Sequence, residues 1–312
     1  MAFDAQAAGV YVIAATPFHP DGRIDTSSVD RLTDFYLAAG ATGITALGVM
    51  GEAPKLDAEE SIALVRQMVR RAGNVPVVVG VTSPGFAPMR ALARGAMEAG
   101  AAGVMIAPPN TLRTDDQIVT YYAQAREAIG ADVPFALQDY PLGFSVVMTP
   151  QVLARIVAQN PSCVMLKLED WPGLEKISAV RNLEREGKMR RTSILTGNGG
   201  IFVDFELERG ADGAMTGYAF PDMLSELVRL SAAGERDRAH DLFDAHLPLM
   251  RYEQQPGVGL AARKYVLFRR GVLASDAQRK PAGVLSAAGR AEVEYLLARL
   301  GRVDARARLG PA

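Results

Sequence analysis

The chain has 312 residues, of which 49% are hydrophobic and 22% charged, and this balance excludes a disordered or fibrous protein. Its 34 lysines and arginines stand against 35 acidic residues, so a net charge of −1 gives no general reason to bind nucleic acid or an anionic membrane. No uncharged apolar run approaches the roughly 20 residues of a membrane helix, and the first residues lack the pattern of a secretory signal. We expect a cytoplasmic globular protein without nucleic-acid or membrane partners.

Eight short apolar runs alternate with longer amphipathic stretches. Runs without polar alternation are typical of strands buried on both faces, as parallel strands are. The predicted strands are Val10–Thr16, Gly43–Val49, Pro76–Val81, Gly103–Ala107, Pro134–Tyr140, Cys163–Leu168, Ser193–Thr196 and Gly213–Gly217. The predicted helices between them are Ser27–Ala39, Ala58–Ala72, Ala87–Ala99, Asp115–Ile129, Pro150–Gln159, Gly173–Glu186 and Gly200–Arg209. This alternation predicts βαβ units and a parallel sheet.

A short internal repeat joins a helix end to a strand at three places, Gly40–Ile44, Gly100–Val104 and Gly210–Ala214. The first glycine of each suits a left-handed helix C-cap, and the second suits a tight strand entry. The repeated corner favours a closed (β/α)8 TIM barrel. The alternative is a doubly wound sheet with a dinucleotide site, but Ala14–Phe18 stands where its glycine fingerprint is expected.

Residues 1–220 are predicted to form the barrel, and residues 221–302 a C-terminal helical extension that packs on it within the same domain. The extension's predicted helices are Pro221–Ala233, Asp237–Met250, Leu260–Arg269 and Gly289–Leu300. Arg263 and Lys264 are expected on a solvated helix face. Residues 303–312 are expected to form a flexible tail.

Active sites of such barrels lie at the C-terminal ends of the strands. Lys167 ends the sixth predicted strand, in the run Met165–Glu169, and a period of two puts it on the same face as Met165 and Glu169. A lysine among apolar neighbours is costly unless it reacts or pairs. One interpretation is a nucleophilic amine for Schiff-base chemistry, and the other is an ion pair with Glu169.

Several landmarks stand in the order and spacing of a known family. They are Thr16-Pro17-Phe18 after the first strand, Gly48-Val49-Met50-Gly51-Glu52 after the second, Lys167 at the end of the sixth and Thr196-Gly197-Asn198-Gly199 at the end of the seventh. The sequence resembles the dihydrodipicolinate synthase and N-acetylneuraminate lyase superfamily over nearly its whole length. This resemblance implies a TIM barrel, usually tetrameric, in which Lys167 forms an imine with a small-molecule 2-oxo acid such as pyruvate. It also implies a homodimer or homotetramer.

The chain departs from the family motif Gly-Thr-Thr/Ser-Gly-Glu after the second strand. Val49 and Met50 replace both hydroxyl-bearing residues, which in the family bind the carboxylate of the oxo acid and relay protons. Backbone amides of Met50 and Gly51 remain to hold a carboxylate. We therefore predict that Gly48, Val49, Met50 and Gly51 bind substrate, and that Glu52 is a structural carboxylate.

The chain also lacks the family's catalytic tyrosine. The family's fifth strand ends Tyr-Asn-x-Pro, and aligning Pro141 with that proline puts Gln138 in the place of the tyrosine and Asp139 in that of the asparagine. Tyr140 is either a displaced phenol or an aromatic wall, and Glu169 is either a proton shuttle or the counter-ion of the lysine. The predicted catalytic residues are Lys167, Tyr140 and Glu169.

Two further groups needed for dihydrodipicolinate synthesis are missing. Pro108-Pro109-Asn110 replaces a tyrosine after the fourth strand, and Leu142-Gly143-Phe144 stands where an arginine is expected. We therefore do not expect that activity. Further predicted substrate-binding residues are Gln138, Gly197, Asn198 and Thr216. Five residues in or beside strand-end loops hint at a hydrophobic or aromatic substrate; they are Met50, Phe144, Trp171, Tyr218 and Phe220.

No metal and no cofactor are expected, because His19, His240 and His246 are scattered, and Cys163 is expected to be a buried thiol. Three functions stay open. The first is a Schiff-base-forming lyase of the class I aldolase type acting on a 2-oxo acid. The second is a dehydratase or hydratase of the same superfamily, and the third is a non-catalytic 2-oxo acid binding protein.

Overall fold

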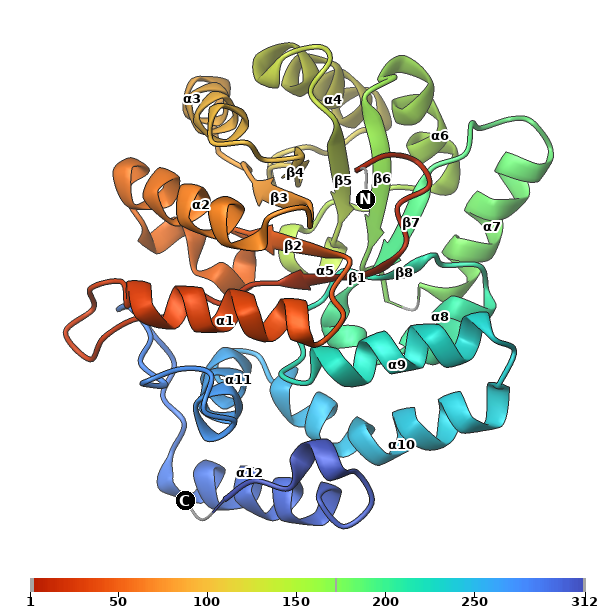
Figure 1. Cartoon of the computed structure of the whole chain (residues 1–312). Helices are drawn as coiled ribbons and strands as arrows, with labels where there is room; N and C mark the ends of the chain where they lie inside the picture. Colours follow the sequence, from red (N-terminus) through yellow and green to blue (C-terminus); the bar gives the residue numbers. More distant parts are fainter. Residues whose placement is uncertain (1–2, 172, 311–312) are drawn as a thin grey trace.

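The computed structural model describes residues 3–171 and 173–310, and its centre is a closed barrel of eight parallel strands paired in chain order. The strands are β1 (Gly9–Ile13), β2 (Gly43–Ala46), β3 (Val77–Gly80), β4 (Gly103–Ile106), β5 (Phe135–Asp139), β6 (Cys163–Leu168), β7 (Ser193–Thr196) and β8 (Gly213–Ala214). Each overlaps a predicted run, and β1 pairs with β8 so that the sheet has no free edge. The predicted (β/α)8 TIM barrel is confirmed (Figure 1).

Helices cover the outside of the barrel between successive strands. They are α1 (Thr26–Ala38), α2 (Ala58–Ala72), α3 (Phe86–Glu98), α4 (Asp115–Ile129), α6 (Pro150–Gln159), α7 (Leu174–Arg185) and α8 (Val203–Glu208), with one short turn, α5 (Pro141–Phe144), directly after β5. Local capping chemistry starts several of them. At α2 the Asp57 side chain accepts from the Glu60 amide while the Glu60 side chain accepts from the Asp57 amide, which satisfies two amides that have no partner within the helix.

The repeated glycines have the conformations that the sequence predicts. Gly40, Gly100 and Gly210 have φ angles of 80°, 92° and 99°, in the left-handed region that suits glycine. At the strand entry, a Cβ on Gly43 would lie 2.2 Å from the ring of Tyr11. This glycine therefore lets an aromatic side chain of β1 pack in the barrel interior.

Alternating side chains of the strands fill the barrel interior. The buried cluster there includes Tyr11, Ile13, Val78, Met105, Ala136, Met165, Leu195 and Met215. On β6, Met165 belongs to this cluster, whereas Leu166 and Leu168 belong to the core between barrel and helices. Lys167 is two residues beyond Met165, so it projects into the interior near the C-terminal ends of the strands.

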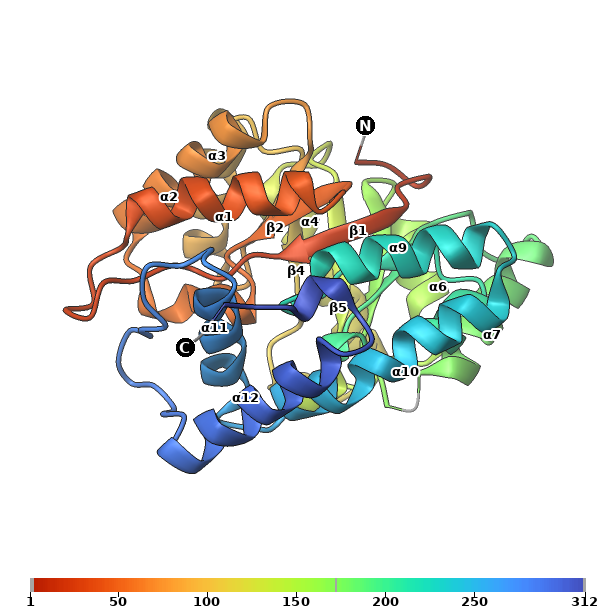
Figure 2. The same ribbon diagram turned by 60° about the horizontal axis from the view of Figure 1, so that its bottom comes forward.

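The C-terminal helices are α9 (Pro221–Ala232), α10 (Arg236–Glu253), α11 (Gly259–Arg269) and α12 (Ala287–Leu300). Helix α9 lies beside α1 and contacts β1, and α10–α12 form a further layer on that side of the barrel (Figures 1 and 2). Helix α10 continues three residues past its predicted end at Met250. Its contacts with the turn η3 (Asn198–Gly200) bring the extension to the ends of the strands.

The end of the chain differs from the flexible tail expected from residue 303. Asp304 Oδ2 lies 2.8 Å from His246 Nε2, and the other ring nitrogen of His246 lies 2.8 Å from the Tyr218 hydroxyl. Burial opposes ionisation of Asp304, but hydrogen bonds from His246 and Arg306 lower its pKa to about 2. The short helix η4 (Ala305–Ala307) follows, with Ala307 buried. The hydrogen bond between Asp304 and the buried His246 fixes this segment against the C-terminal helices. Residues 311 and 312 lie outside the described residues.

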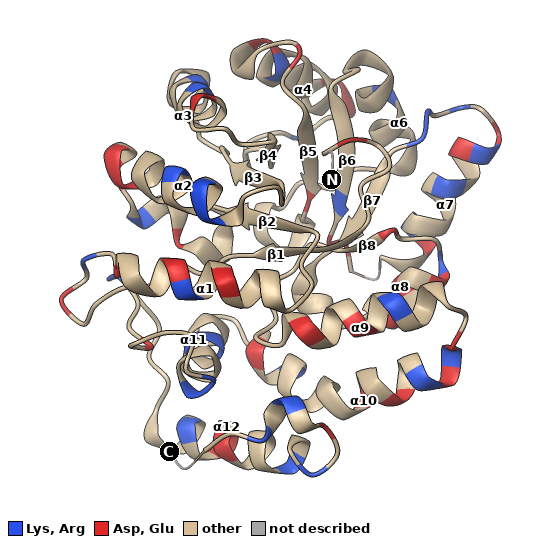
Figure 3. Ribbon diagram, in the orientation of Figure 1, with Lys and Arg blue, Asp and Glu red and all other residues tan. Residues whose placement is uncertain are grey.

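Charged residues of both signs are distributed over the outer helices, and the strands carry very few of them (Figure 3). Within the part of the chain that the structure describes, no helix combines the length and the apolar character needed to cross a bilayer.

Candidate active site

Lys167 lies at the end of β6 with only 6% of its side chain exposed. Its Nζ lies 2.9 Å from Glu169 Oε1, so the lysine forms a buried ion pair with the carboxylate two residues on. The strand register sets Lys167 beside Gln138 of β5 and Leu195 of β7. Of the two interpretations of Lys167, the ion pair describes the geometry without a ligand. The same geometry places the Glu169 carboxylate, a proton acceptor, beside the lysine amine.

Groups at the C-terminal ends of two neighbouring strands hold the Glu169 carboxylate, which itself follows β6. Gln138 Nε2 donates to Glu169 Oε1 at 2.7 Å, and the Asn198 backbone amide donates to Oε2 at 2.9 Å. Gly197 leaves room for it, because a Cβ there would lie 2.3 Å from Glu169 Oε2. Gln138 and Asn198, predicted to bind substrate, thus position the carboxylate that faces Lys167.

A cavity of about 760 Å³ opens at this point, a size typical of small-molecule sites. The predicted residues that line it are Val49, Met50, Gln138, Tyr140, Lys167, Glu169, Asn198 and Thr216. Residues from the C-terminal extension, which the sequence did not indicate, also line it; they include Glu253, Gln254, Gln255, Arg263 and Gln278. Gly48, Gly51 and Gly197 stand outside this lining.

The turn after β2 differs from the prediction at Gly51. Its amide donates to the Gly48 carbonyl at 2.9 Å within the turn η1 (Val49–Gly51), and its carbonyl accepts from Thr16 Oγ1 at 2.6 Å. The prediction that the Gly51 amide holds a substrate carboxylate is wrong, because the turn already uses that amide. Val49 is 60% exposed at the cavity, and Met50 lies deeper.

Tyr140 follows β5 directly and lines the cavity, with its ring edge-on to Phe144. Burial, and secondarily the charge of Glu169, raise the pKa of its hydroxyl. In the described residues we find no hydrogen bond from this phenol to Lys167 or Glu169. The geometry favours Tyr140 as an aromatic wall, and Glu169 is the acidic side chain in contact with the lysine.

The other acidic residues near β6 are bound to a different lysine. Lys176 Nζ of α7 lies 2.7 Å from Asp139 Oδ2 and 2.5 Å from Asp170 Oδ2. Burial raises the pKa of Asp139 to about 6, although Lys176 opposes the shift. These two carboxylates anchor the loop after β6 to α7 and stand outside the cavity lining.

The hydrophobic or aromatic substrate that the sequence suggests stays a prediction, and Phe144 lines a pocket beside the cavity. Met50 and Trp171 line the cavity, but Tyr218 and Phe220 are buried against His246. Charged and amide side chains make up much of the remaining lining. The cavity lining therefore combines polar and apolar groups.

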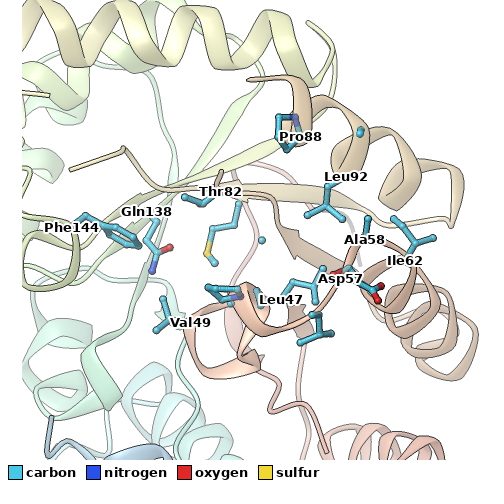
Figure 4. A pocket seen from close by; sticks show the side chains of 18 residues that line it. Leu47, Val49, Asp57, Ala58, Ile62, Thr82, Pro88, Leu92, Gln138 and Phe144 are labelled. Carbon is cyan, nitrogen blue, oxygen red and sulfur yellow. The ribbon is translucent and has the colours of Figure 1, made fainter. Parts of the chain in front are cut away.

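A second, smaller pocket of about 370 Å³ adjoins the cavity (Figure 4). Val49 and Gln138 line both spaces, and Phe144 lies beside Gln138 on the same side of the smaller one. Its far side is formed by apolar residues of α2 and α3, such as Ile62 and Leu92. Gly48, predicted to bind substrate, lines this pocket instead.

The prediction that Arg263 and Lys264 lie on a solvated face is wrong. Arg263 Nε donates to Glu253 Oε2 at 2.7 Å, and Lys264 Nζ donates to Glu52 Oε1 at 2.5 Å; all four side chains are buried. Helix α11 is enclosed between the barrel and the other C-terminal helices, so both cations needed anionic partners. Glu52 is structural, as predicted, with lysines as its partners.

Among residues 3–171 and 173–310, no group of three His, Cys, Asp or Glu side chains is arranged to hold a metal ion. Cys163 is buried as predicted, and burial raises the pKa of its thiol to about 12. A group this difficult to ionise does not act as a nucleophile.

The model of the Dihydrodipicolinate synthetase family matches residues 6–300. The chain belongs to this family. The match spans the barrel and most of the C-terminal extension, which confirms the resemblance drawn from the strand-end motifs. Members of this family are lyases, and the protein is accordingly an enzyme of the lyase type.

Individual relatives within the Dihydrodipicolinate synthetase family have two different names. The chain is 31% identical over 297 residues to L-2-keto-3-deoxyarabonate dehydratase from Azospirillum brasilense, covering 94% of each chain. It is 30% identical over 256 residues to 4-hydroxy-tetrahydrodipicolinate synthase from Methylococcus capsulatus, covering 77% of this chain and 85% of the relative. The crystal structure of a dihydrodipicolinate synthase from Rhodopseudomonas palustris has 62% sequence identity and a TM-score of 0.95, covering 96% of this chain and 99% of that one.

Proposed function

We propose that this enzyme is a Schiff-base-forming lyase that dehydrates a 2-oxo acid bearing a hydroxyl group on C4. One observation carries the proposal: Lys167 Nζ lies 2.9 Å from a carboxylate, Glu169, that groups at the ends of two neighbouring strands hold in place inside a cavity. A lysine amine forms the imine, and a carboxylate beside it moves protons.

In this mechanism the Lys167 amine attacks the C2 carbonyl and the oxygen leaves as water, which forms an iminium ion. Glu169 removes a proton from C3, and the electron pair flows to nitrogen as an enamine. The enamine then expels the C4 hydroxyl group, and Glu169 returns its proton so that the hydroxyl leaves as water. Hydrolysis of the resulting conjugated imine frees Lys167. The net change is loss of one water from C3 and C4.

The residues that are missing support dehydration over dihydrodipicolinate synthesis. The Gln138 amide does not ionise near neutral pH and so cannot act as a general acid or base, and Val49 and Met50 have no hydroxyl groups to relay a proton. The arginine expected after the fifth strand is also absent, and Leu142–Phe144 stands in its place. The relative from Azospirillum brasilense that is named a dehydratase covers 94% of this chain. It supports a 3-deoxy-2-oxo sugar acid as the substrate class.

Aldol cleavage is the alternative reaction of the same enamine. It breaks the C3–C4 bond and needs a base at the C4 hydroxyl, a role that Glu169 or Tyr140 could also fill from the cavity wall. The products separate the two reactions. Dehydration releases water and keeps the carbon chain intact, whereas aldol cleavage releases pyruvate and an aldehyde.

The test has two stages. Borohydride reduction in the presence of pyruvate, followed by mass spectrometry, should give one adduct on Lys167 and none in Lys167→Ala. Incubation with 4,5-dihydroxy-2-oxopentanoate should then give a product that is lighter by one water, with no pyruvate detected by lactate dehydrogenase. An adduct without turnover on any hydroxylated 2-oxo acid would favour a non-catalytic binding protein, and absence of the adduct would refute imine chemistry.

A further inference from the structure

Arg263 of α11 is a cation that reaches the active cavity from the C-terminal extension. Its side chain is only 4% exposed, yet it lines the cavity together with Lys167. Nε donates to Glu253, while Nη1 contacts the sulfur of Met50. Within the described residues, no oxygen acceptor is found for either terminal amino group. A buried guanidinium with free donors is costly unless an anion binds there.

The contact with Met50 places this guanidinium beside the turn after β2. The family resemblance implies hydroxyl groups at positions 49 and 50 that bind the carboxylate of the oxo acid, and here both positions carry apolar side chains. The Gly51 amide is also occupied within its turn. The carboxylate has therefore lost most of its usual donors at the very turn that Arg263 contacts.

The charges around the cavity fit an anionic ligand. Its lining contains three cations, Lys55, Lys167 and Arg263, and two anions, Glu169 and Glu253. Lys167 pairs with Glu169, and Lys55 lies 2.8 Å from Glu52 Oε2, on the far side of the turn after β2. Arg263 keeps the most donors free for a ligand, and its planar fork matches the two oxygens of a carboxylate.

We propose that Arg263 binds the carboxylate of the 2-oxo acid and replaces the hydroxyl groups lost after the second strand. This inference rests on the proposed function, since it assigns the carboxylate end of the substrate whose carbonyl reacts with Lys167. Recognition of the carboxylate is thereby transferred from the barrel loop to the C-terminal extension.

Glu253 is the positioning residue for this arginine. It ends α10, its side chain is fully buried, and its Oε2 fixes the Nε edge of the guanidinium. Gly259 at the start of α11 permits this arrangement, because a Cβ there would lie 2.1 Å from the Glu253 carbonyl oxygen. Nε is paired with Glu253 and Nη1 contacts Met50, so Nη2 is the terminal amino group left with its donors free for a ligand.

The experiment compares pyruvate with pyruvamide, in which an uncharged amide replaces the carboxylate. Half-saturating concentrations for borohydride trapping on Lys167 are measured for the wild type, Arg263→Gln, Arg263→Lys and Lys55→Gln. Lys55→Gln is the matched control, because it also removes one cation from the cavity lining. The ratio of the two ligands' half-saturating concentrations is independent of the folded fraction, so partial unfolding of a variant does not mimic the expected result.

In the wild type, pyruvate should saturate at a concentration about 10- to 100-fold below that of pyruvamide, as expected for hydrogen bonds between charged groups. Arg263→Gln should bring this ratio close to one by weakening pyruvate binding alone. Arg263→Lys should keep part of the preference, and Lys55→Gln should keep all of it.

Two failures are distinguishable. If the wild type traps neither ligand, the proposed imine chemistry fails before Arg263 is tested. If the wild type traps both and Arg263→Gln retains the preference for pyruvate, the role of Arg263 is refuted while the imine chemistry stands. Loss of the preference in Lys55→Gln alone would assign the carboxylate to Lys55 and equally refute the proposal.

Discussion

Glu169→Gln is the substitution that tests the catalytic arrangement most directly. The glutamine side chain has the same shape as glutamate, but it has only one acceptor oxygen and no longer exchanges a proton near neutral pH. In the structure, Oε1 faces two donors, Lys167 Nζ and Gln138 Nε2, and Oε2 faces the Asn198 amide. In either orientation the new amide nitrogen therefore faces a donor.

The expected loss can be estimated from these contacts. Removing a positioned acid–base group lowers turnover by about 10²- to 10⁴-fold, which corresponds to about 2.7–5.5 kcal/mol of activation free energy. The unfavourable donor–donor contact adds a local destabilisation of about 1–3 kcal/mol. That cost lowers the melting temperature but not the ability of the remaining folded enzyme to form an imine.

The assay measures kcat for dehydration and, separately, the yield of the borohydride adduct with pyruvate. Glu169→Gln should keep the adduct on Lys167 while kcat falls by the factor given above. Tyr140→Phe is the matched control from the same cavity wall, and its kcat should stay within about threefold of the wild type, since an unused hydroxyl carries no part of the barrier. A large loss in Tyr140→Phe with normal turnover in Glu169→Gln would refute the assignment and make the displaced phenol the proton shuttle.

Three further predictions concern a glycine beside Glu169, a buried carboxyl group and the oligomeric state. Gly197→Ala would bring a Cβ within 2.3 Å of Glu169 Oε2, so the carboxylate must move by about 1 Å. A displacement of this size can lower turnover by about 10²-fold. Gly85→Ala is the control, because the nearest atom to its Cβ would lie 3.9 Å away, and its kinetics should be unchanged. Burial raises the pKa of Glu206 from 4.5 to about 8. Wild-type stability should therefore decline as pH rises between these values, and Glu206→Gln should make this decline smaller in urea unfolding at pH 5 and pH 8. Sedimentation should give a homodimer or homotetramer, and a fully active monomer would contradict the expectation drawn from the family.

Local sequence patterns were sufficient for the barrel and for the position of its lysine. Apolar runs without polar alternation marked the eight strands, because a strand covered on both faces leaves no place for polar residues. Repeated glycine pairs marked the helix-to-strand corners, since left-handed backbone and close packing suit that residue alone. A period of two along β6 placed Lys167 with Met165 in the interior.

The partners of that lysine depended on tertiary structure. Glu169 is held by Gln138, 31 residues earlier, and by the amide of Asn198, 29 residues later, and the parallel pairing of β5, β6 and β7 brings these strand ends together. Arg263 contacts Met50 across 213 residues, and nothing local shows that α11 turns its charged residues inward. Short-range periodicity predicts the buried face of a helix or strand from its apolar residues, so it places charged residues on the exposed face. A buried ion pair breaks this rule, because its charged residues lie in the interior. Sequence alone therefore determined the scaffold and the position of Lys167 at a strand end, and the packing of distant segments decided which side chains surround it.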